Sequence, residues 1–264
     1  MYNFQYHSPK TVAEAAKTVA AAADGKLMGG GMTLIPTLKL RLAKPSDVVD
    51  LGRIAGLQGI KREGNAVVIG AMTRHADVAG SDAVKSAIPA LAALAGGIGD
   101  PAVRNRGTIG GSLANNDPSA DYPAAVLALN ATIVTNKRKI AADDFFKGMF
   151  ETALAADEII TAVSFPVPEK AAYMKFPNPA SRYAIVGVFV AKTKDAVRTA
   201  VTGAGACVFR QKEMEAALGK AFTPDAIKPI AQKPDGLNSD IHASAEYRAH
   251  LVGVMARRAV AAAG

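Results

Sequence analysis

Residues 26–36 read KLMGGGMTLIP and place three glycines and a threonine between a short apolar segment and a segment that suits a helix. The pattern predicts a strand, a glycine loop and a helix in direct succession. Glycine lets the backbone approach a ligand closely, Thr33 offers a hydroxyl, and the free N–H groups at a helix start favour an anion. This is the chemistry of a diphosphate site, although a tight strand–helix turn explains so short a pattern as well.

This first loop differs from two common nucleotide-binding motifs. Leu34 occupies the place of the third glycine of the dinucleotide fingerprint G-x-G-x-x-G. No Gly-Lys-Ser/Thr sequence follows, as it would in a P-loop. The loop therefore indicates neither a Rossmann domain nor a P-loop nucleotide hydrolase.

A second glycine-containing stretch, residues 104–121, reads RNRGTIGGSLANNDPSAD. It adds arginines, hydroxyls, a glycine pair and carboxylates to the chemistry of the first loop. Arginine suits a phosphate or an electron-rich ring, and Asp121 suits the hydroxyls of a sugar chain. A polar loop of Asx turns is the alternative interpretation. A bulky dinucleotide needs contacts at both ends, so two such loops in one chain favour the binding interpretation.

The remaining sequence predicts an α+β chain. Residues 96–123 are rich in Gly, Asn, Asp and Pro and are expected to form a long irregular loop, which in an ordered protein is usually functional. The last quarter predicts two paired strands followed by helices, beyond a boundary near residues 165–175. The expected helices are 11–23, 34–41, 73–80, 89–95, 124–128, 213–218, 224–230 and 243–263, and the expected strands are 26–28, 48–51, 66–69, 131–135, 157–165, 183–191 and 196–206, with Ile60 facing 66–69 across a hairpin turn.

Composition and charge exclude several classes of protein. The chain has 264 residues, of which 50% are hydrophobic and 20% are charged, as in an ordinary globular protein. A single cysteine excludes an iron–sulfur cluster or a disulfide within the chain. The net charge of +8 comes from scattered residues, and tryptophan is absent, which argues against a nucleic-acid-binding surface. We expect no membrane span and no secretory signal, which indicates the cytoplasm.

Other reactive residue types form no catalytic or metal-binding pattern. Ser112 lacks the final glycine of a nucleophile elbow, and Cys207 is expected to be a small buried apolar residue. The four histidines are far apart in sequence, which favours capping or solvated roles. Asp143 and Asp144 are expected to cap a helix. We therefore predict no catalytic residue and no metal ligand in this chain.

Four ordered motifs together resemble the FAD-binding medium subunit of the molybdenum hydroxylases, the carbon monoxide dehydrogenase and xanthine dehydrogenase family. Residues 29–34 are similar to the family's Ala-Gly-Gly-Gln/His-Ser-Leu segment, and residues 108–121 to its Thr/Ser-Ile-Gly-Gly segment with a following aspartate. Residues 175–184 resemble the start of the family's C-terminal domain, and residues 239–251 its C-terminal helix. The resemblance covers essentially the whole chain.

The resemblance implies a set of cofactor contacts. Residues 29–33 and 108–112 would hold the FAD diphosphate through amides and hydroxyls, Asp121 would bind a sugar-chain hydroxyl, and Lys175 would lie near the polar edge of the flavin ring. Tyr183 would cover one face of the ring and control access to it. The complete expected set is Gly29, Gly30, Gly31, Met32, Thr33, Leu34, Ile98, Thr108, Ile109, Gly110, Gly111, Ser112, Asn115, Asp121, Ile159, Ile160, Lys175 and Tyr183.

The same resemblance implies the fold. It predicts a two-subdomain, PCMH/VAO-like FAD-binding fold at residues 1–172, with subdomains of about 1–55 and 56–172, and a smaller C-terminal domain at 173–264. One departure from the family pattern is Met32, which replaces a glutamine or histidine near the cofactor and counts against carbon monoxide as the substrate.

The function that follows from the resemblance is electron transfer. A large partner would carry the molybdopterin-type molybdenum cofactor, a small partner would carry [2Fe-2S] clusters, and the assembly would be a dimer of heterotrimers. Electrons would reach the FAD of this chain and pass to an external acceptor. Two alternatives are a self-contained FAD reductase or oxidase, for which we identify no acid or base, and a non-catalytic basic nucleotide-binding module.

Overall fold

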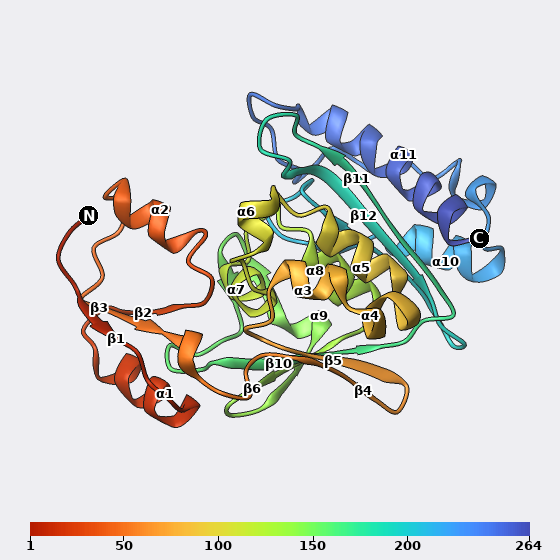
Figure 1. The fold of residues 1–264 in the computed structure, drawn as a ribbon. Helices are drawn as coiled ribbons and strands as arrows, with labels where there is room; N and C mark the ends of the chain where they lie inside the picture. Colours follow the sequence, from red (N-terminus) through yellow and green to blue (C-terminus); the bar gives the residue numbers. More distant parts are fainter.

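The computed structural model describes residues 1–264. Its first part is a small parallel sheet that stands apart from the rest of the chain on the side of the N-terminus (Figure 1). Two helices flank this sheet, and the turn η1 leads out of it. The elements are β1 (Gln5–His7), α1 (Val12–Ala21), β2 (Gly25–Met28), α2 (Leu34–Lys39), β3 (Asp47–Asp50) and η1 (Leu51–Arg53), with strand order β1-β3-β2.

A five-stranded antiparallel sheet forms the base of the second part, in the order β4-β5-β10-β6-β7. Helices cover one face of it and enclose the largest core, which contains 33 buried residues. The strands are β4 (Ile60–Glu63), β5 (Ala66–Gly70), β6 (Thr132–Thr135), β7 (Lys139–Ala141) and β10 (Ile160–Pro166). The helices are α3 (His75–Gly80), α4 (Asp82–Ala87), α5 (Pro89–Gly96), α6 (Pro101–Arg104), α7 (Ile109–Asn115), α8 (Tyr122–Ala128) and α9 (Ala142–Phe145), and a hairpin of β8 (Phe146–Gly148) and β9 (Glu151–Thr152) follows.

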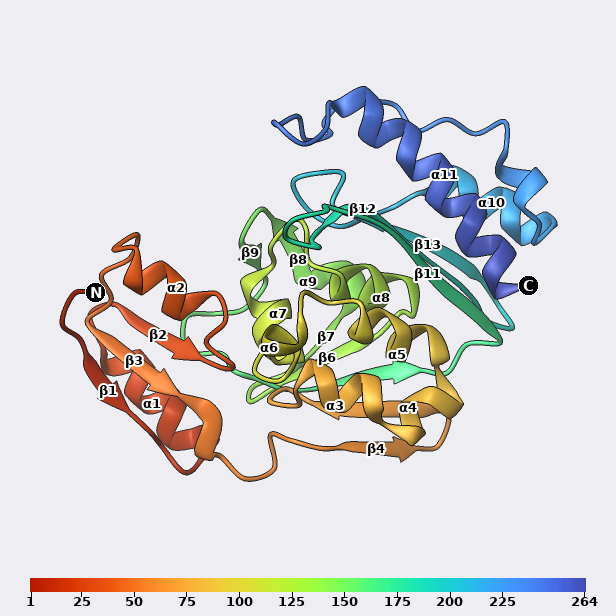
Figure 2. The same cartoon turned by 45° about the horizontal axis from the view of Figure 1, so that its top comes forward.

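The last part is a four-stranded antiparallel sheet in the order β11-β12-β13-β14. Figure 2 shows α5 and α8 between this sheet and the strands below, with α11 on the opposite face. Helices therefore cover both faces, so β12 is an almost continuous run of buried residues rather than an alternating one. The elements are β11 (Lys170–Pro177), β12 (Ala184–Lys192), β13 (Val197–Thr202), β14 (Phe209–Arg210), α10 (Lys212–Lys220), η2 (Pro224–Ile227) and α11 (Ala245–Ala263).

The mixed helix-and-sheet architecture confirms the predicted α+β class. The expected hairpin at Gly64, the two paired strands of the last quarter and the long C-terminal helix are all present. No helix of the structure combines the length and apolar composition that crossing a membrane requires.

The prediction of an irregular loop over residues 96–123 is wrong. This stretch contains α6, α7 and the first two residues of α8. Asp100 caps α6 and accepts a hydrogen bond from the Val103 N–H at 2.9 Å, while Thr108 caps α7. The caps stabilise both short helices, and α7 also packs Ile109 and Leu113 into the core, although the composition of this stretch resembles that of a loop.

Other predicted elements also differ from the structure. Strands β1 and β11 were not predicted, and the helix expected at 224–230 is only the 3₁₀ turn η2. Asp143 does not cap a helix, because the N-cap of α9 is Ala141 and the Asp143 carboxylate pairs instead with Arg198 at 2.5 Å. Cys207 is half-buried and lies outside any strand.

Candidate functional site

A cavity of about 680 Å³ lies where the N-terminal sheet meets the helical layer. Its volume is in the range of small-molecule and cofactor sites. The glycine loop after β2 forms one wall, α7 and the segment before α8 form another, and residues 180–183 close it from the C-terminal part. All the expected binding residues line this cavity except Ile109 and Lys175.

The first glycine loop presents its backbone amides to the cavity. Residues 29–33 lie outside every helix and strand, and their N–H groups donate to no acceptor elsewhere in the chain. Gly31 has a φ of +75°, a left-handed conformation that glycine adopts without strain. Thr33 makes no capping hydrogen bond at the start of α2, so its hydroxyl is also free. The loop is thus a row of unpaired donors beside an open space.

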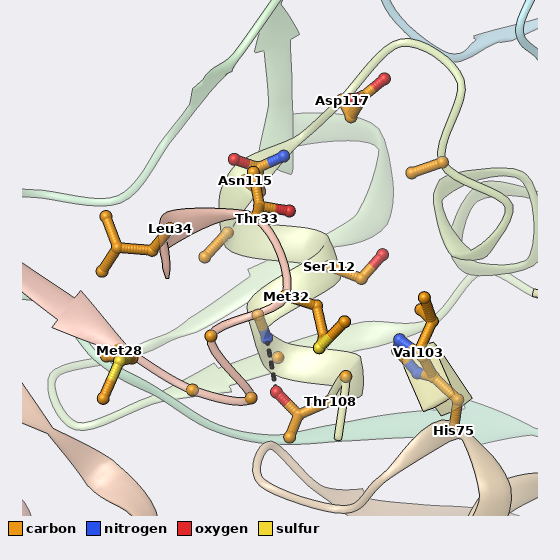
Figure 3. Close-up of a pocket in the computed structure, with 18 of the residues that line it drawn as sticks. Met28, Met32, Thr33, Leu34, His75, Val103, Thr108, Ser112, Asn115 and Asp117 are labelled. Carbon is orange, nitrogen blue, oxygen red and sulfur yellow. Dashed lines mark hydrogen bonds between the residues drawn. The ribbon is translucent and has the colours of Figure 1, made fainter. Parts of the chain in front are cut away.

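The second loop was expected to offer free backbone amides, but in the structure most of these amides are hydrogen-bonded within the chain. The amides of Ile109 and Gly110 donate to Thr73 and Ala71 at 3.1 and 2.8 Å. The amide of Gly111 donates to the Thr108 hydroxyl oxygen at 3.2 Å (Figure 3). These amides are not free to hold a diphosphate. The loop instead offers polar side chains, since Thr108, Ser112 and Asn115 line the cavity, while the Ile109 side chain is fully buried in the core.

The glycines of the two loops allow the loops to touch. A Cβ atom at Gly30 would lie 2.0 Å from the carbonyl oxygen of Arg106, and one at Gly29 would lie 2.8 Å from the Thr108 hydroxyl oxygen. The glycine requirement at position 30 therefore comes from loop-to-loop packing. Sequence reasoning attributed it to the close approach of a ligand.

Asp121 lies at the cavity wall and is buried with two donors. The Tyr173 hydroxyl donates to its Oδ1 atom, and the Lys175 ammonium donates to its Oδ2 atom at 3.1 Å. Burial raises the pKa of Asp121, and the nearby Lys175 charge and both hydrogen bonds oppose this rise. Lys175 also donates to the Gly97 carbonyl at 2.8 Å, and it does not line the cavity. Any sugar hydroxyl that binds Asp121 must use the acceptor positions that these donors leave.

Tyr183 stands at the mouth of the cavity. Its side chain is 51% exposed, and it follows Arg182, whose φ of +62° marks a tight turn. Asn178 holds this turn, because its side-chain oxygen accepts the amides of Ala180 and Ser181 at 2.9 and 3.1 Å. Partial desolvation, followed by the charges of two cavity aspartates, raises the pKa of the Tyr183 hydroxyl. The tyrosine is thus presented over the opening by a fixed loop.

The structure adds His75 to the cavity, a residue that sequence reasoning set aside. Figure 3 shows His75 and Val103 facing the same space as Met32. The His75 side chain is 5% exposed, and its Nδ1 atom has no hydrogen-bond partner. Burial, with a smaller effect from the charge of Arg104, lowers the pKa of His75 to about 4. The imidazole is therefore neutral at physiological pH. In the sequence, only the position of His75 shortly after β5 could have indicated that it lines the cavity.

Glu158 also lines the cavity, and its carboxylate is held in place by several hydrogen bonds. Its carboxylate accepts from the Arg138 guanidinium at 2.9 Å and from the Thr135 hydroxyl at 2.7 Å. These hydrogen bonds, opposed by burial, lower the pKa of Glu158 to about 2. Ile159 and Ile160 follow directly and give this part of the cavity an apolar lining. The structure contains no group of three or more His, Cys, Asp or Glu residues able to hold a metal ion.

Comparison with known proteins places this geometry in a family. A family model described as the FAD binding domain in molybdopterin dehydrogenase matches residues 2–168, and one described as the CO dehydrogenase flavoprotein C-terminal domain matches residues 171–263. The chain belongs to this flavoprotein family. The resemblance inferred from the four motifs is thereby confirmed.

Individual relatives match over nearly the full length. The chain is 38% identical to the nicotine 6-hydroxylase medium subunit of Paenarthrobacter nicotinovorans, covering 98% of this chain and 97% of the relative. It is 36% identical to the carbon monoxide dehydrogenase medium chain of Hydrogenophaga pseudoflava, covering 98% and 96%. The reconstituted CO dehydrogenase from Oligotropha carboxidovorans matches with a TM-score of 0.90 at 34% identity, covering 99% and 97%. This flavoprotein is the FAD subunit of a molybdenum hydroxylase complex, and thus an oxidoreductase subunit.

Proposed function

We propose that the cavity is the FAD site and that the free amides of residues 29–33 hold the diphosphate. These amides carry the proposal, because consecutive unpaired N–H groups beside a cavity form an anion-binding concavity. The hydroxyls of Thr33, Thr108 and Ser112 add further donors. Ile98, Ile159 and Ile160 provide apolar contact for flat rings. The donor set and the lining both suit a dinucleotide.

The other residues of the chain position the cofactor and control access to it. Bound FAD accepts electrons and passes them on, so the chain itself needs to bind, orient and shield the ring. In this proposal Asp121 accepts from the sugar chain, and Tyr183 covers the ring at the cavity mouth. Lys175 acts through Asp121, since the ammonium is held on that carboxylate and on the Gly97 carbonyl.

We further propose two partners for this subunit. A large partner would carry the molybdopterin-type molybdenum cofactor, and a small partner would carry the [2Fe-2S] clusters that deliver electrons to this FAD. Relatives named as medium subunits of hydroxylase and dehydrogenase complexes support this arrangement, and so does the presence of only one cysteine here. A dimer of heterotrimers is the proposed assembly, and mass measurement of the purified complex tests it.

The domain division is proposed on the distribution of cores. The sheet of residues 1–55 packs in a cluster of eight buried residues that is separate from the main core, and Leu57, Met72 and Ile159 of the second subdomain complete this cluster. A third cluster lies between the C-terminal sheet and α11. We place the main boundary near residue 172; β11 begins at Lys170 and runs across that position. Limited proteolysis tests the division by the sites of first cleavage.

A substitution in the second loop tests the site. Thr108→Arg fills the cavity beside the first loop and should abolish FAD retention in the purified chain. Thr11→Arg, which alters an N-cap of α1 far from the cavity, should keep the flavin. Full flavin occupancy in Thr108→Arg would count against the assignment of this cavity.

A further inference from the structure

A buried network joins the C-terminal sheet to the cavity wall through Asp121. Its two carboxylate oxygens take hydrogen bonds from different donors, Tyr173 on one and Lys175 on the other. The side chains of Asp121 and Lys175 are 5% and 12% exposed. A carboxylate buried to this degree stays charged only with strong partners. The network therefore favours the ionised form of Asp121 against the effect of burial.

Strand β11 supplies both donors. Residues 173 and 175 are two apart, so their side chains lie on the same face of the strand. On the neighbouring strand, Gly187 pairs with Lys175, and a Cβ atom there would lie 2.3 Å from the Tyr173 hydroxyl. The absence of a side chain at position 187 thus opens the path along which Tyr173 reaches Asp121.

The same sheet also holds the backbone before Asp121. The Thr202 hydroxyl donates to the Ala120 carbonyl at 2.6 Å, and the Gly203 amide donates to the Pro118 carbonyl at 2.8 Å. Both donors come from the end of β13. The C-terminal domain therefore sets the position of this cavity segment, and Tyr173 and Lys175 are the residues of that domain that donate to its carboxylate.

We propose that Tyr173 is a positioning residue that orients the Asp121 carboxylate toward the cofactor. The proposal rests on the FAD site proposed above. An ionised carboxylate has about four acceptor positions. Tyr173 and Lys175 use two of them, which leaves acceptors for the sugar hydroxyls of FAD. Without the Tyr173 hydroxyl, one oxygen of a buried anion loses its donor.

Several charged and titratable groups interact with Asp121. Lys175 and Tyr173 face it from β11, and its charge also acts on Tyr122 and Tyr183; Asp117 acts on Tyr183 as well. Burial raises the pKa of Asp121, whereas Tyr173 and Lys175 lower it. Loss of the Tyr173 donor therefore raises the Asp121 pKa further. In this proposal the sugar hydroxyls donate to the ionised carboxylate, so on lowering the pH the variant loses FAD affinity at a higher pH than the wild-type chain does.

The test is the FAD dissociation constant of the full chain, measured by flavin fluorescence from pH 5 to 9. Tyr173→Phe should weaken FAD about tenfold at pH 7, the scale of one hydrogen bond to a charged group, and move the pH midpoint of binding upward. The ring stacking on Phe189, at 6.1 Å between centroids, is kept in this variant. Asp121→Asn should bind weakly with no titration in this range.

Tyr122→Phe is the matched control, because the Tyr122 hydroxyl is buried without a partner. It should leave both the affinity and the pH midpoint unchanged. A Tyr173→Phe profile identical to that of the wild type would overturn the positioning role while leaving the FAD site intact. Absence of FAD binding by the wild-type chain at every pH would overturn the proposed function and this inference together.

Discussion

Gly30 lies so close to Arg106 that a Cβ atom on the glycine would stand 2.0 Å from the arginine's carbonyl oxygen. The two residues belong to the two loops that form adjoining walls of the cavity. Neither loop can hold its position if the other moves. The contact links the geometry of the free amides in the first loop to the capped helix α7 in the second.

Gly30→Ala should therefore separate the loops. We expect loss of FAD and destabilisation by about 1–3 kcal/mol, the usual cost of forcing an atom into a packed site. Gly80→Ala, at the end of α3, meets nothing within 4 Å and should keep the flavin at unchanged or slightly higher stability. Flavin content and denaturant unfolding measure both effects. Equal behaviour of the two variants would contradict the loop contact.

Thr108 has two roles that a pair of variants can separate. Thr108→Val removes the N-cap of α7, at a cost of about 1 kcal/mol, and also the hydroxyl at the cavity. Thr11→Val removes the N-cap of α1 alone. Both should lower stability by a similar amount in thermal unfolding, but only Thr108→Val should weaken FAD in equilibrium titration. Unchanged FAD affinity in Thr108→Val would show that this hydroxyl is not a ligand.

The low pKa of Glu158 predicts how the free energy of unfolding depends on pH. Its folded-state pKa of about 2 lies below the ordinary value of 4.5, so its contribution is complete above about pH 4.5 and disappears as the pH falls toward 2. Glu158→Gln should lower stability at pH 6 and flatten the decline between pH 4.5 and 2. Glu63→Gln, at an exposed ion pair with Lys61, should follow the wild type. The free energy of unfolding across this range checks the prediction.

Tyr183 should affect electron exchange more than cofactor retention. Its side chain is half-exposed at the cavity mouth. In the proposed site its removal would uncover the ring, whereas the proposed diphosphate contacts would remain. Tyr183→Ala is expected to retain FAD and change the reoxidation rate severalfold, and Tyr183→Phe should behave as the wild type. Stopped-flow absorbance measures the rate. Loss of FAD with a normal rate in the remaining holoprotein would contradict the proposed gating.

Sequence reasoning identified the two loops because their chemistry is local. Consecutive glycines and a threonine between a strand and a helix are visible within ten residues. The helices α6 and α7 were missed for a different reason. Their start signals, Asp100 before Pro101 and Thr108 before an apolar residue, are present, but the surrounding Gly, Asn and Asp residues mask them.

Contacts between distant segments could not be predicted from the residues. Tyr173 and Asp121 are 52 positions apart, and no periodicity links them. Which amides of the glycine loops stay free also depends on neighbours, since Ala71 and Thr73 take those of α7. The sequence therefore indicates the kind of site. Which of its amides and side chains are free to bind a ligand is decided by the packed structure.

The most direct test of the FAD site is a visible absorption spectrum of the purified chain, with the acid-released cofactor identified by mass. We predict a flavin spectrum and a released mass equal to that of FAD. A chain that shows no flavin, even after reconstitution with excess FAD and the neighbouring subunits, would contradict the proposal.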